Sequence, residues 1–553
     1  MNISATRYLL AVLFCALAVV SIADERIDVS SFGAVPDDNL DDTPALRAAA
    51  AYCRTHPGTT LTFAPGVYDL QDSLALDIER RAISGDLGRG IEVQWQLFNP
   101  LRPFAVGLDF TGAQRLVIEA EGATLRIGGW MQVLSFVRCS DLLLKGLAVT
   151  CRRPAATEAR VVSLSADYYD LSFDPQLYAY VDSIVQGRYY FYSPRRRTFF
   201  NLPIGQTELL EPGHIRIHSD RQPSIGDVLI IRYGGHYRPC IMIKECERVR
   251  IDNVCLRSFP GMGIVGHQSE DITIDALRVE PEPGRYSSTS TDATHFTSCS
   301  GSLTISNSSF CGNGDDCTNI HNYYYRAVPT DNPQTVELRI EGADLHAQSL
   351  DPPHKGDTLL LVGARDMRCL DRFVVEHVVT DEAHWRVLAH LNHTVSADVL
   401  NESLMYNYTR FPRVRILGNT VDYHNGRAFL LKARDVEVRR NMISHCTLSA
   451  IKLGAELSWR EAGPVERAVV EDNDISHTGT DPFCVASCLM LSTEARETPP
   501  HVNTNITVRH NRLQSDQPES ILIADAAHVL IADNQFVDAA QIIIKNSEDV
   551  RIY

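Results

Sequence analysis

Three aspartates in this sequence have the residue type and spacing that acid–base chemistry requires. Asp315 and Asp316 are adjacent in the segment Asn313-Gly-Asp-Asp-Cys317, and Asp292 lies 23 residues before Asp315. A glycine-led turn lets both neighbouring carboxyls face outward. Carboxyls that crowd one face cannot all ionise easily, so we expect one to have a raised pKa and to keep its proton near neutral pH. The alternative interpretation is that Gly-Asp-Asp is ordinary turn chemistry.

A short repeated pattern could bring these aspartates together. It consists of an apolar residue, any residue, a second apolar residue, two further residues and then often Asn. The copies with the Asn begin at Val414, Val436, Ala468, Ile506 and Val529, and their asparagines are Asn419, Asn441, Asn473, Asn511 and Asn534. Neighbouring copies are often 22 or 23 residues apart, as from Val414 to Val436 and from Ile506 to Val529. The alternation has period two, which indicates strands rather than a helical repeat.

A strand of three alternating residues cannot bury its apolar face alone, but copies stacked about 4.8 Å apart form a continuous core. The sequence therefore predicts an all-β fold, a right-handed parallel β-helix. Each Asn is expected to take the left-handed turn conformation and to bond to the Asn of the next coil. With one coil per 23 residues, Asp292 is expected to lie on the rung next to Asp315.

The ends and interruptions of the repeat predict the domain organisation. The alanine-rich segment 45–54 follows Asp41-Asp-Thr-Pro44 and is expected to form a helix that caps the open end of the stack. Two stretches rich in other short strand signals break the rhythm. The predicted segments are a signal peptide (1–23), the N-terminal cap and first coils (24–152), an inserted β-domain (153–238), coils with the aspartates (239–325), a second inserted β-domain (326–411) and C-terminal coils (412–553).

The N-terminus and the net charge predict the compartment and exclude some partners. Arg7, the apolar run from Tyr8 to Val20 and the small-x-small site Ser21-Ile-Ala23 are typical of a cleaved signal peptide. We expect an exported protein without a membrane span; periplasm and exterior both stay open. The chain has 69 acidic and 52 basic residues and a net charge of −17, which argues against a nucleic-acid-binding surface.

The cysteines are expected to be structural. Fourteen are present, and removal of Cys15 with the signal peptide leaves an odd number. Cys484 and Cys488 could form a bridge in an oxidising compartment. Cys139, Cys246 and Cys299 precede apolar strands and are interpreted as buried small hydrophobes. Because no Cys/His cluster has zinc spacing, no metal is expected.

Five segments together resemble a known family. They are Asp292-Ala-Thr-His-Phe296, Cys299-Ser-Gly301, Gly314-Asp-Asp-Cys-Thr-Asn-Ile-His321, Gly426-Arg-Ala-Phe-Leu-Leu431 and Gly454-Ala-Glu-Leu-Ser-Trp-Arg-Glu-Ala-Gly-Pro-Val465. Their sequence and order resemble the family-110 glycoside hydrolases, exo-acting α-1,3-galactosidases, which belong to the pectin-lyase-like β-helix superfamily. The Gly-Asp-Asp-Cys piece also occurs in polygalacturonases, so the later Glu-x-x-Trp-x-Glu segment is what separates the two interpretations.

The resemblance implies hydrolysis of a terminal α-1,3-linked galactose with inversion and without metal or cofactor. The family's catalytic aspartates fall on Asp292, Asp315 and Asp316, and which is acid and which is base stays open. Carboxyls on adjacent rungs would be about 5 Å apart, the retaining spacing, whereas inversion needs about 6.5–9.5 Å. Side chains that diverge at the turn, or the use of Asp316, could open that gap. The acceptor could be branched, as in blood-group-B-type glycans, or linear.

Sugar recognition needs an aromatic face and planar hydrogen-bonding groups. Trp459, Glu456 and Glu461 offer these within one short segment, and Trp130 is a second aromatic candidate. The remaining candidates are His295 and His321, which could orient carboxylates, contact sugar or be structural, and the cations Arg427 and Lys452.

Two other functions stay open. A polygalacturonase-like hydrolase would need basic subsites for its polyanionic substrate, whereas Glu456 and Glu461 would repel a uronate. A non-catalytic glycan-binding β-helix would show no turnover. The expected partner is an oligosaccharide or glycoconjugate with terminal α-galactose; the oligomeric state is open, with a homodimer as one alternative.

Overall fold

A computed structural model of the chain describes residues 25–553 except 89–96, 98–101, 179–187, 234–236, 341–348, 482, 498, 500 and 538–540. The predicted signal peptide therefore lies outside the described residues. No helix in the described ranges is long and apolar enough to cross a membrane.

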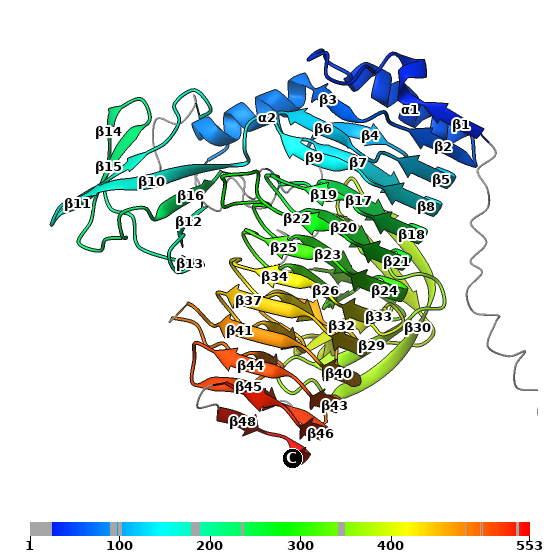
Figure 1. The fold of residues 1–553 in the computed structure, drawn as a ribbon. Coiled ribbons are helices and arrows are strands. Elements are labelled where there is room, and N and C mark those ends of the chain that lie inside the picture. Colours follow the sequence, from blue (N-terminus) through cyan, green and yellow to red (C-terminus); the bar gives the residue numbers. More distant parts are fainter. Residues whose placement is uncertain are drawn as a thin grey trace, which may run out of the picture.

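The described residues form a right-handed parallel β-helix of three sheets with 13, 12 and 11 strands. Figure 1 shows the rungs stacked from α1 (Thr43–Thr55) at one end to the C-terminus at the other. The 12-stranded sheet carries the candidate site. It contains β4 (Val106–Asp109), β7 (Gln132–Val137), β17 (Ile241–Lys244), β20 (Ile264–His267), β23 (Thr294–Thr297), β26 (Thr318–Tyr323), β35 (Phe429–Leu431), β38 (Ile451–Leu453), β42 (Leu489–Leu491), β45 (Glu519–Ala524) and β48 (Gln541–Lys545), with β39 (Glu461–Ala462) antiparallel to β26.

The other two coil sheets complete the cylinder. The 13-stranded sheet contains β1 (Glu25–Asp28), β2 (Thr59–Thr62), β5 (Gln114–Glu119), β8 (Ser140–Lys145), β18 (Glu247–Asp252), β21 (Glu270–Asp275), β24 (Ser300–Ser306), β33 (Arg413–Leu417), β36 (Asp435–Arg439), β40 (Arg467–Glu471), β43 (Asn503–Arg509), β46 (Ala526–Ala532) and β49 (Glu548–Ile552). The 11-stranded sheet contains β3 (Gly66–Gln71), β6 (Ala123–Gly128), β9 (Ala148–Cys151), β19 (Cys255–Leu256), β22 (Arg278–Val279), β25 (Ser309–Cys311), β34 (Thr420–Asp422), β37 (Met442–Cys446), β41 (Asp474–Thr478), β44 (Arg512–Ser515) and β47 (Gln535–Phe536).

Alternation along each short strand builds the core. On β23 and β26, Phe296 and Ile320 point inward and are almost completely buried, and Leu431 continues the same column on β35. Their neighbours along the strands carry polar groups on the outer face. One apolar cluster runs through the coils from Val29 to Ile531. The outer face of the 12-stranded sheet is thereby available for chemistry.

The asparagine ladder forms as predicted, but the left-handed residue is a different one. Asn441 donates through Nδ2 to Asn473 Oδ1 (2.9 Å), and Asn473 donates in the same way to Asn511 (2.9 Å). The positive φ angles belong to the residues just before, Arg440 (54°) and Asp472 (58°). The preceding residue therefore makes the turn, and the Asn side chain points into the stack to satisfy the backbone of its neighbours.

Replacing Asn473 with Ala is expected to lower the free energy of unfolding by about 1–3 kcal/mol, because buried ladder groups lose their partners. Asn473 is 2% exposed, and its Oδ1 also accepts the backbone N–H of Asn441. Urea denaturation measures the change, with the exposed Asn201→Ala as control. Equal midpoints for the two variants would show that the ladder is not stabilising.

Helices lie at the N-terminal end of the stack. Pro44 stands in the first turn of α1, and Leu46, Ala49 and Cys53 are its buried face. A second helix, α2 (Ser73–Ser84), was not expected from the sequence; Asp72 caps it by accepting from the backbone N–H groups of Leu74 and Ala75. The short helix η1 (Val29–Phe32) precedes α1 in the chain, whereas the short helix α4 (Ala397–Leu400) lies between β31 and β32.

Two antiparallel sheets interrupt the coils. The first has seven strands, β10 (Ala156–Leu164), β11 (Tyr168–Ser172), β12 (Arg188–Ser193), β13 (Thr198–Phe200), β14 (Thr207–Glu211), β15 (His214–His218) and β16 (Val228–Arg232). The second has six, β27 (Arg326–Pro329), β28 (Thr335–Arg339), β29 (Thr358–Gly363), β30 (Cys369–Asp381), β31 (Arg386–Leu391) and β32 (Ser403–Asn407). In Figure 1 the first sheet projects from the side of the stack.

The proposed Cys484–Cys488 bridge is wrong for this structure. All thirteen cysteines of the described ranges are free. Cys488 is buried beside Thr478, whereas Cys484 is exposed near the Asp481 carboxylate. The interpretation of Cys139, Cys246 and Cys299 as buried small hydrophobes is confirmed, with exposures of 2%, 1% and 2%.

Candidate active site

Asp292 and Asp316 stack on adjacent rungs of the β-helix. The predicted pairing of Asp292 with Asp315 is therefore wrong by one residue. Thr294 pairs with Thr318 in the parallel register, so one coil measures 24 residues here. Asp292 and Asp316 each stand two residues before these strands, and the N–H of Ala293 donates to the carbonyl of Asp316 (3.0 Å). Asp315 is one residue out of line and is less buried.

The environment of the stacked pair raises both pKa values, in the direction predicted for crowded carboxyls. Asp292 is 5% and Asp316 3% exposed. Burial raises the pKa of Asp316 to about 7, although Arg427 beside it acts in the opposite direction. Burial, and then the charge of Asp316, raise the pKa of Asp292 well above its ordinary value. The pair can therefore hold a proton and a negative charge together near neutral pH.

Arg427 occupies the same position on the third rung. It stands two residues before β35, and its backbone N–H donates to Asp316 Oδ1 (2.7 Å). Its guanidinium lies 3.6 Å from Asp316 Oδ2 and 2.9 Å from Glu456 Oε1. Gly426 makes this approach possible, because a Cβ there would lie 2.9 Å from Asp316 Oδ1 and its φ is +133°. Arg427 thus supports the ionised form of Asp316.

A tight hairpin brings both glutamates and Trp459 over the strands. Glu456 and Glu461 exchange backbone hydrogen bonds of 3.0 Å in each direction, and β39 pairs with the end of β26. Gly463, just after the hairpin, has φ +150° and a Cβ there would clash with the Lys432 carbonyl at 2.1 Å. Trp459, near the tip, keeps 45% of its surface exposed. The hairpin therefore places an accessible aromatic face beside the aspartates.

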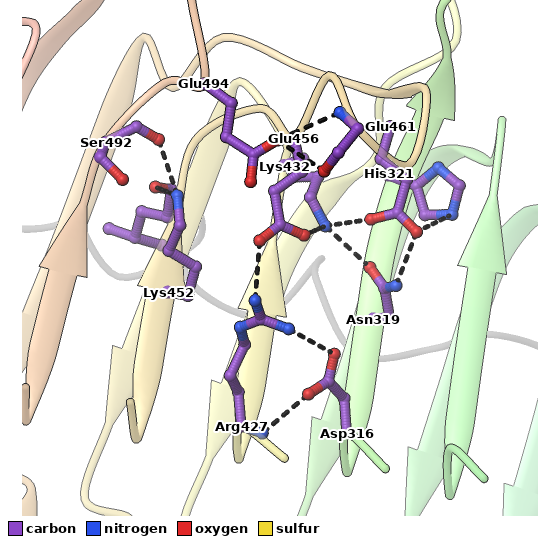
Figure 2. A network of polar contacts seen from close by, with 12 residues as sticks. Asp316, Asn319, His321, Arg427, Lys432, Lys452, Glu456, Glu461, Ser492 and Glu494 are labelled. Atoms are coloured by element: carbon purple, nitrogen blue, oxygen red, sulfur yellow. Dashed lines mark hydrogen bonds and ion pairs between the residues drawn. The ribbon is translucent and has the colours of Figure 1, made fainter. Parts of the chain in front are cut away.

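Lys432 is the central cation of the network and was missed by the sequence analysis. Figure 2 shows its ammonium between Glu456, Glu461 and Asn319. It lies 3.2 Å from Glu456 Oε2, contacts Glu461 Oε2 closely and is completely buried. Lys432 directly follows the apolar strand β35. In the sequence alone, a buried lysine at the end of a strand cannot be distinguished from a solvent-exposed one.

The two glutamates are held ionised by these cations. Burial raises the pKa of Glu456, but Lys432 and Arg427 lower it more, so it lies below the ordinary value. For Glu461, burial is likewise outweighed by His321 and Lys432. Two anions therefore face two cations. The glutamates hold the cations in place rather than serving as proton donors.

The two histidines form a chain behind the aspartates. His295 Nδ1 lies 2.6 Å from Asp292 Oδ2, and His295 Nε2 lies 2.9 Å from His321 Nε2. His321 Nδ1 donates to the backbone carbonyl of Asn322 (2.8 Å). Burial lowers the pKa of each histidine to about 4. Of the roles left open by the sequence, the geometry favours orientation of a carboxyl.

The first inserted sheet contributes an arginine that binds the backbone of both aspartate turns. Arg232, at the end of β16, is 6% exposed and donates through Nη1 to the carbonyls of Gly314 (3.0 Å) and Ser290. These carbonyls precede Asp315 and Asp292, so one guanidinium ties the two aspartate turns together. Its plane also lies over Tyr190, 4.7 Å from the ring centroid.

These groups surround a pocket of about 170 Å³ lined by Met262, Asp292, His295, Asp315, Asp316, Asn319, Arg427, Leu430, Glu456, Trp459 and Glu461. This volume is below the about 300–1,000 Å³ typical of sites for drug-sized ligands, which favours a small ligand such as one sugar ring. Larger hollows of about 690 and 420 Å³ lie elsewhere. The first is an open groove in which Arg413 and Arg467 both pair with Asp435, and it lacks the stacked aspartates.

Three of the predicted binding residues do not line the pocket, and one of them, His321, lies behind His295. Trp130 is 1% exposed in a separate apolar cluster, where Tyr237 donates to its carbonyl (2.8 Å). Lys452 is buried, and its ammonium donates to the carbonyls of Leu453 (3.1 Å) and Ser492 (2.7 Å), as Figure 2 shows for Ser492. The two glycines before Trp130 signal a close turn rather than an open face, and Lys432 takes the role proposed for Lys452.

One set of residues in the site has metal-ligand character. His295, His321 and Glu461 each place one ligand atom within 4.8 Å of the others. The Glu461 carboxylate is already bound by Lys432 and by Asn319 Nδ2 (3.1 Å). A divalent cation here would face the buried Lys432 ammonium, so the donor set does not fit a metal well.

Comparison with known proteins identifies the class. No family model matches the chain. Proteins named alpha-1,3-galactosidase A match at 23% identity in Shewanella woodyi (94% of this chain, 87% of the relative) and at 24% in Bacteroides fragilis (93% and 87%). One from Peterkaempfera griseoplana is 26% identical over 81% of this chain and 68% of its own length.

Solved structures with a similar course of the chain were also found. A family 28 exopolygalacturonase from Yersinia enterocolitica has a TM-score of 0.41 at 10% identity, covering 95% of this chain and 78% of that one. An exopolygalacturonase from Thermotoga maritima has a TM-score of 0.43 at 11% identity, covering 95% and 93%.

The protein is a glycoside hydrolase built on a parallel β-helix. The resemblance inferred from the five motifs is confirmed, since the chain is homologous to proteins named alpha-1,3-galactosidase over most of its length.

Proposed function

We propose that this enzyme is an exported, exo-acting α-1,3-galactosidase, which releases terminal galactose from oligosaccharides or glycoconjugates by metal-independent acid–base catalysis. Asp292, Asp315 and Asp316 supply the acid and the base. The observation that carries the proposal is the stacked pair Asp292 and Asp316 in a pocket sized for one sugar ring. The names of the relatives support galactose as that sugar.

Each part of the pocket has a role in this proposal. Trp459 stacks on the apolar face of the galactose ring, Arg427 donates hydrogen bonds to its hydroxyls, and Glu456 and Glu461 accept hydrogen bonds from them. His295 and His321 act behind the aspartates. Inversion rests on the family resemblance, and it requires a water between two carboxyls about 6.5–9.5 Å apart. The anomer of galactose that appears first in solution shows whether the reaction inverts, and so whether the carboxyls are this far apart.

The hairpin glutamates repel a uronate substrate less than their charges in the sequence indicated. Glu456 and Glu461 are neutralised by Arg427 and Lys432, so the hairpin does not present an uncompensated negative charge. The homology, rather than charge, favours a galactoside. A panel of α-1,3-, α-1,4- and α-1,6-galactobiose with polygalacturonate separates the two. Free galactose from the α-1,3 substrate supports the proposal, and cleavage of polygalacturonate alone contradicts it.

Trp459→Ala is expected to raise KM for an α-1,3-galactoside about tenfold, because loss of stacking worth about 1.4 kcal/mol is a factor of ten in affinity. The side chain is 45% exposed, so the denaturation midpoint is expected to stay the same. Initial rates across substrate concentrations measure the effect. The half-buried Trp385→Ala, in the turn between β30 and β31 of the second inserted sheet, is the matched control. An unchanged KM for Trp459→Ala would remove this residue from the binding site.

A further inference from the structure

The direction of the hydrogen bonds behind Asp292 restricts where its proton sits. The chain runs from Asp292 through His295 and His321 to the carbonyl of Asn322, with contacts of 2.6, 2.9 and 2.8 Å. A backbone carbonyl accepts only, so His321 Nδ1 must carry a hydrogen. Burial holds the pKa of His321 at about 4, so the ring is neutral at pH 8 and presents a lone pair at Nε2 toward His295, although the Glu461 carboxylate 3.5 Å from this nitrogen acts in the opposite direction.

That lone pair determines the state of His295. His295 Nε2 faces it at 2.9 Å and must donate, since two lone pairs at this distance would repel. If His295 is neutral, its Nδ1 then accepts. Among the residues that the structure describes, the group that faces this nitrogen is the Asp292 carboxyl, which must be protonated in order to donate. The alternative places the same proton on His295, as an imidazolium beside an ionised Asp292. Either way the unit of Asp292 and His295 holds one proton.

The two forms differ in their cost. Asp292, His295 and His321 are each at most 5% exposed as whole residues, and a buried ion pair between His295 and Asp292 requires desolvation of two charges. Asp316, Glu461, Lys432 and Arg427 are the charged groups that act on Asp292, and Asp316 makes the largest charge contribution. Burial holds the pKa of His295 low, which favours the neutral form of the ring.

We propose that His295 and His321 are positioning residues that keep Asp292 protonated, so that Asp316 is the ionised carboxylate of the stacked pair. The contacts of Asp316 agree, because Arg427 supplies both a backbone N–H at 2.7 Å and a guanidinium at 3.6 Å to its oxygens. The catalytic consequence rests on the proposed function. Asp316 then takes the proton of the attacking water while the bond between the anomeric carbon and the glycosidic oxygen breaks, and Asp292 or Asp315 supplies the proton that the leaving oxygen takes up.

Infrared difference spectroscopy at pH 8 tests this without substrate, so failure of the proposed galactosidase activity would not affect the result. Subtracting the spectrum of Asp292→Asn from that of the full-length protein cancels other buried carboxyls and isolates Asp292. A band of a protonated carboxyl is the expected result. Its absence from the difference spectrum means that Asp292 is ionised, which overturns the proposal.

Two variants of His321 test the role of the chain. In His321→Leu the acceptor is lost, His295 is free to donate from Nδ1 to an ionised Asp292, and the band is expected to shrink by at least half. His321→Gln offers a side-chain carbonyl to His295 Nε2 and is expected to restore it. If the Leu variant misfolds, the Gln and Asp292→Asn variants still decide. A band of full size in His321→Leu, or stoichiometric bound metal by elemental analysis, overturns the proposal.

Discussion

Asp316→Asn is expected to reduce the release of galactose from an α-1,3-galactoside about 10²–10⁴-fold, the range lost with a general acid or base. Asn keeps the size and the contact with the Arg427 N–H but cannot take a proton from water. KM is expected to change little, because the amide still fills the same place in the pocket. Initial rates with and without the substitution measure the loss.

The pH dependence gives this prediction a second, independent part. Burial raises the pKa of Asp316 to about 7, so a base at this position is ionised only above that value. The wild-type kcat/KM is therefore expected to fall as the pH drops below about 7. A carboxyl whose pKa is raised in the folded state adds stability at low pH that is lost as the pH rises toward 7. Above pH 7, Asp316→Asn is thus expected to be as stable as the wild type or more so.

The stability result separates lost chemistry from lost folding. Asp533→Asn is the matched control, because the Asp533 side chain is 71% exposed and far along the chain from the site. It should keep full activity and an unchanged denaturation midpoint. Galactose release at the wild-type rate by Asp316→Asn would contradict the assignment of this residue.

Lys432→Met is expected to lower the free energy of unfolding by about 3–5 kcal/mol, the cost of breaking a buried ion pair by removing one partner. Glu456 and Glu461 would be left in the interior with one cation, Arg427, in reach of Glu456 alone. Loss of activity is expected to accompany it, since the hairpin that carries Trp459 is held through these glutamates. Urea denaturation followed by circular dichroism measures the stability.

Lys452→Met is the matched control for this effect. Lys452 is also buried, but its ammonium binds the carbonyls of Leu453 and Ser492 and no carboxylate of the described part of the chain. Its loss is expected to cost about 1–3 kcal/mol, the range for unsatisfied carbonyls. The double variant Lys432→Met with Glu461→Gln should recover part of the lost stability, because one stranded charge is gone. Equal losses for the two lysine variants would refute the central role of Lys432.

The fold was predictable because its signals are local and repeated. Alternating apolar residues at a spacing of 22 or 23 predicted the parallel coils, and the asparagines after them predicted the ladder of Asn441, Asn473 and Asn511. Helix α2 was missed because its apolar residues do not share the repeat. The left-handed turn was assigned to Asn because Asn adopts positive φ more readily than most residues. In the structure, the position in the coil determines which residue turns, and that residue is the one before the Asn, such as Arg440.

Most residues of the site could be predicted from the sequence, but which of them stack on adjacent rungs could not. Counting one average coil matched Asp292 with Asp315, whereas counting back two residues from β23, β26 and β35 aligns Asp292, Asp316 and Arg427. Contacts without a period could not be found in this way. Arg232 reaches the aspartate turns from an inserted sheet 58 residues before Ser290, and only the folded chain shows that contact.

Proton NMR of α-1,3-galactobiose during the first minutes of hydrolysis tests the central claim most directly. We expect free galactose that appears first as the β-anomer, at a rate that falls at least a hundredfold in Asp316→Asn. Absence of galactose from every α-galactoside, or release at an equal rate by the Asp316→Asn variant, would contradict it.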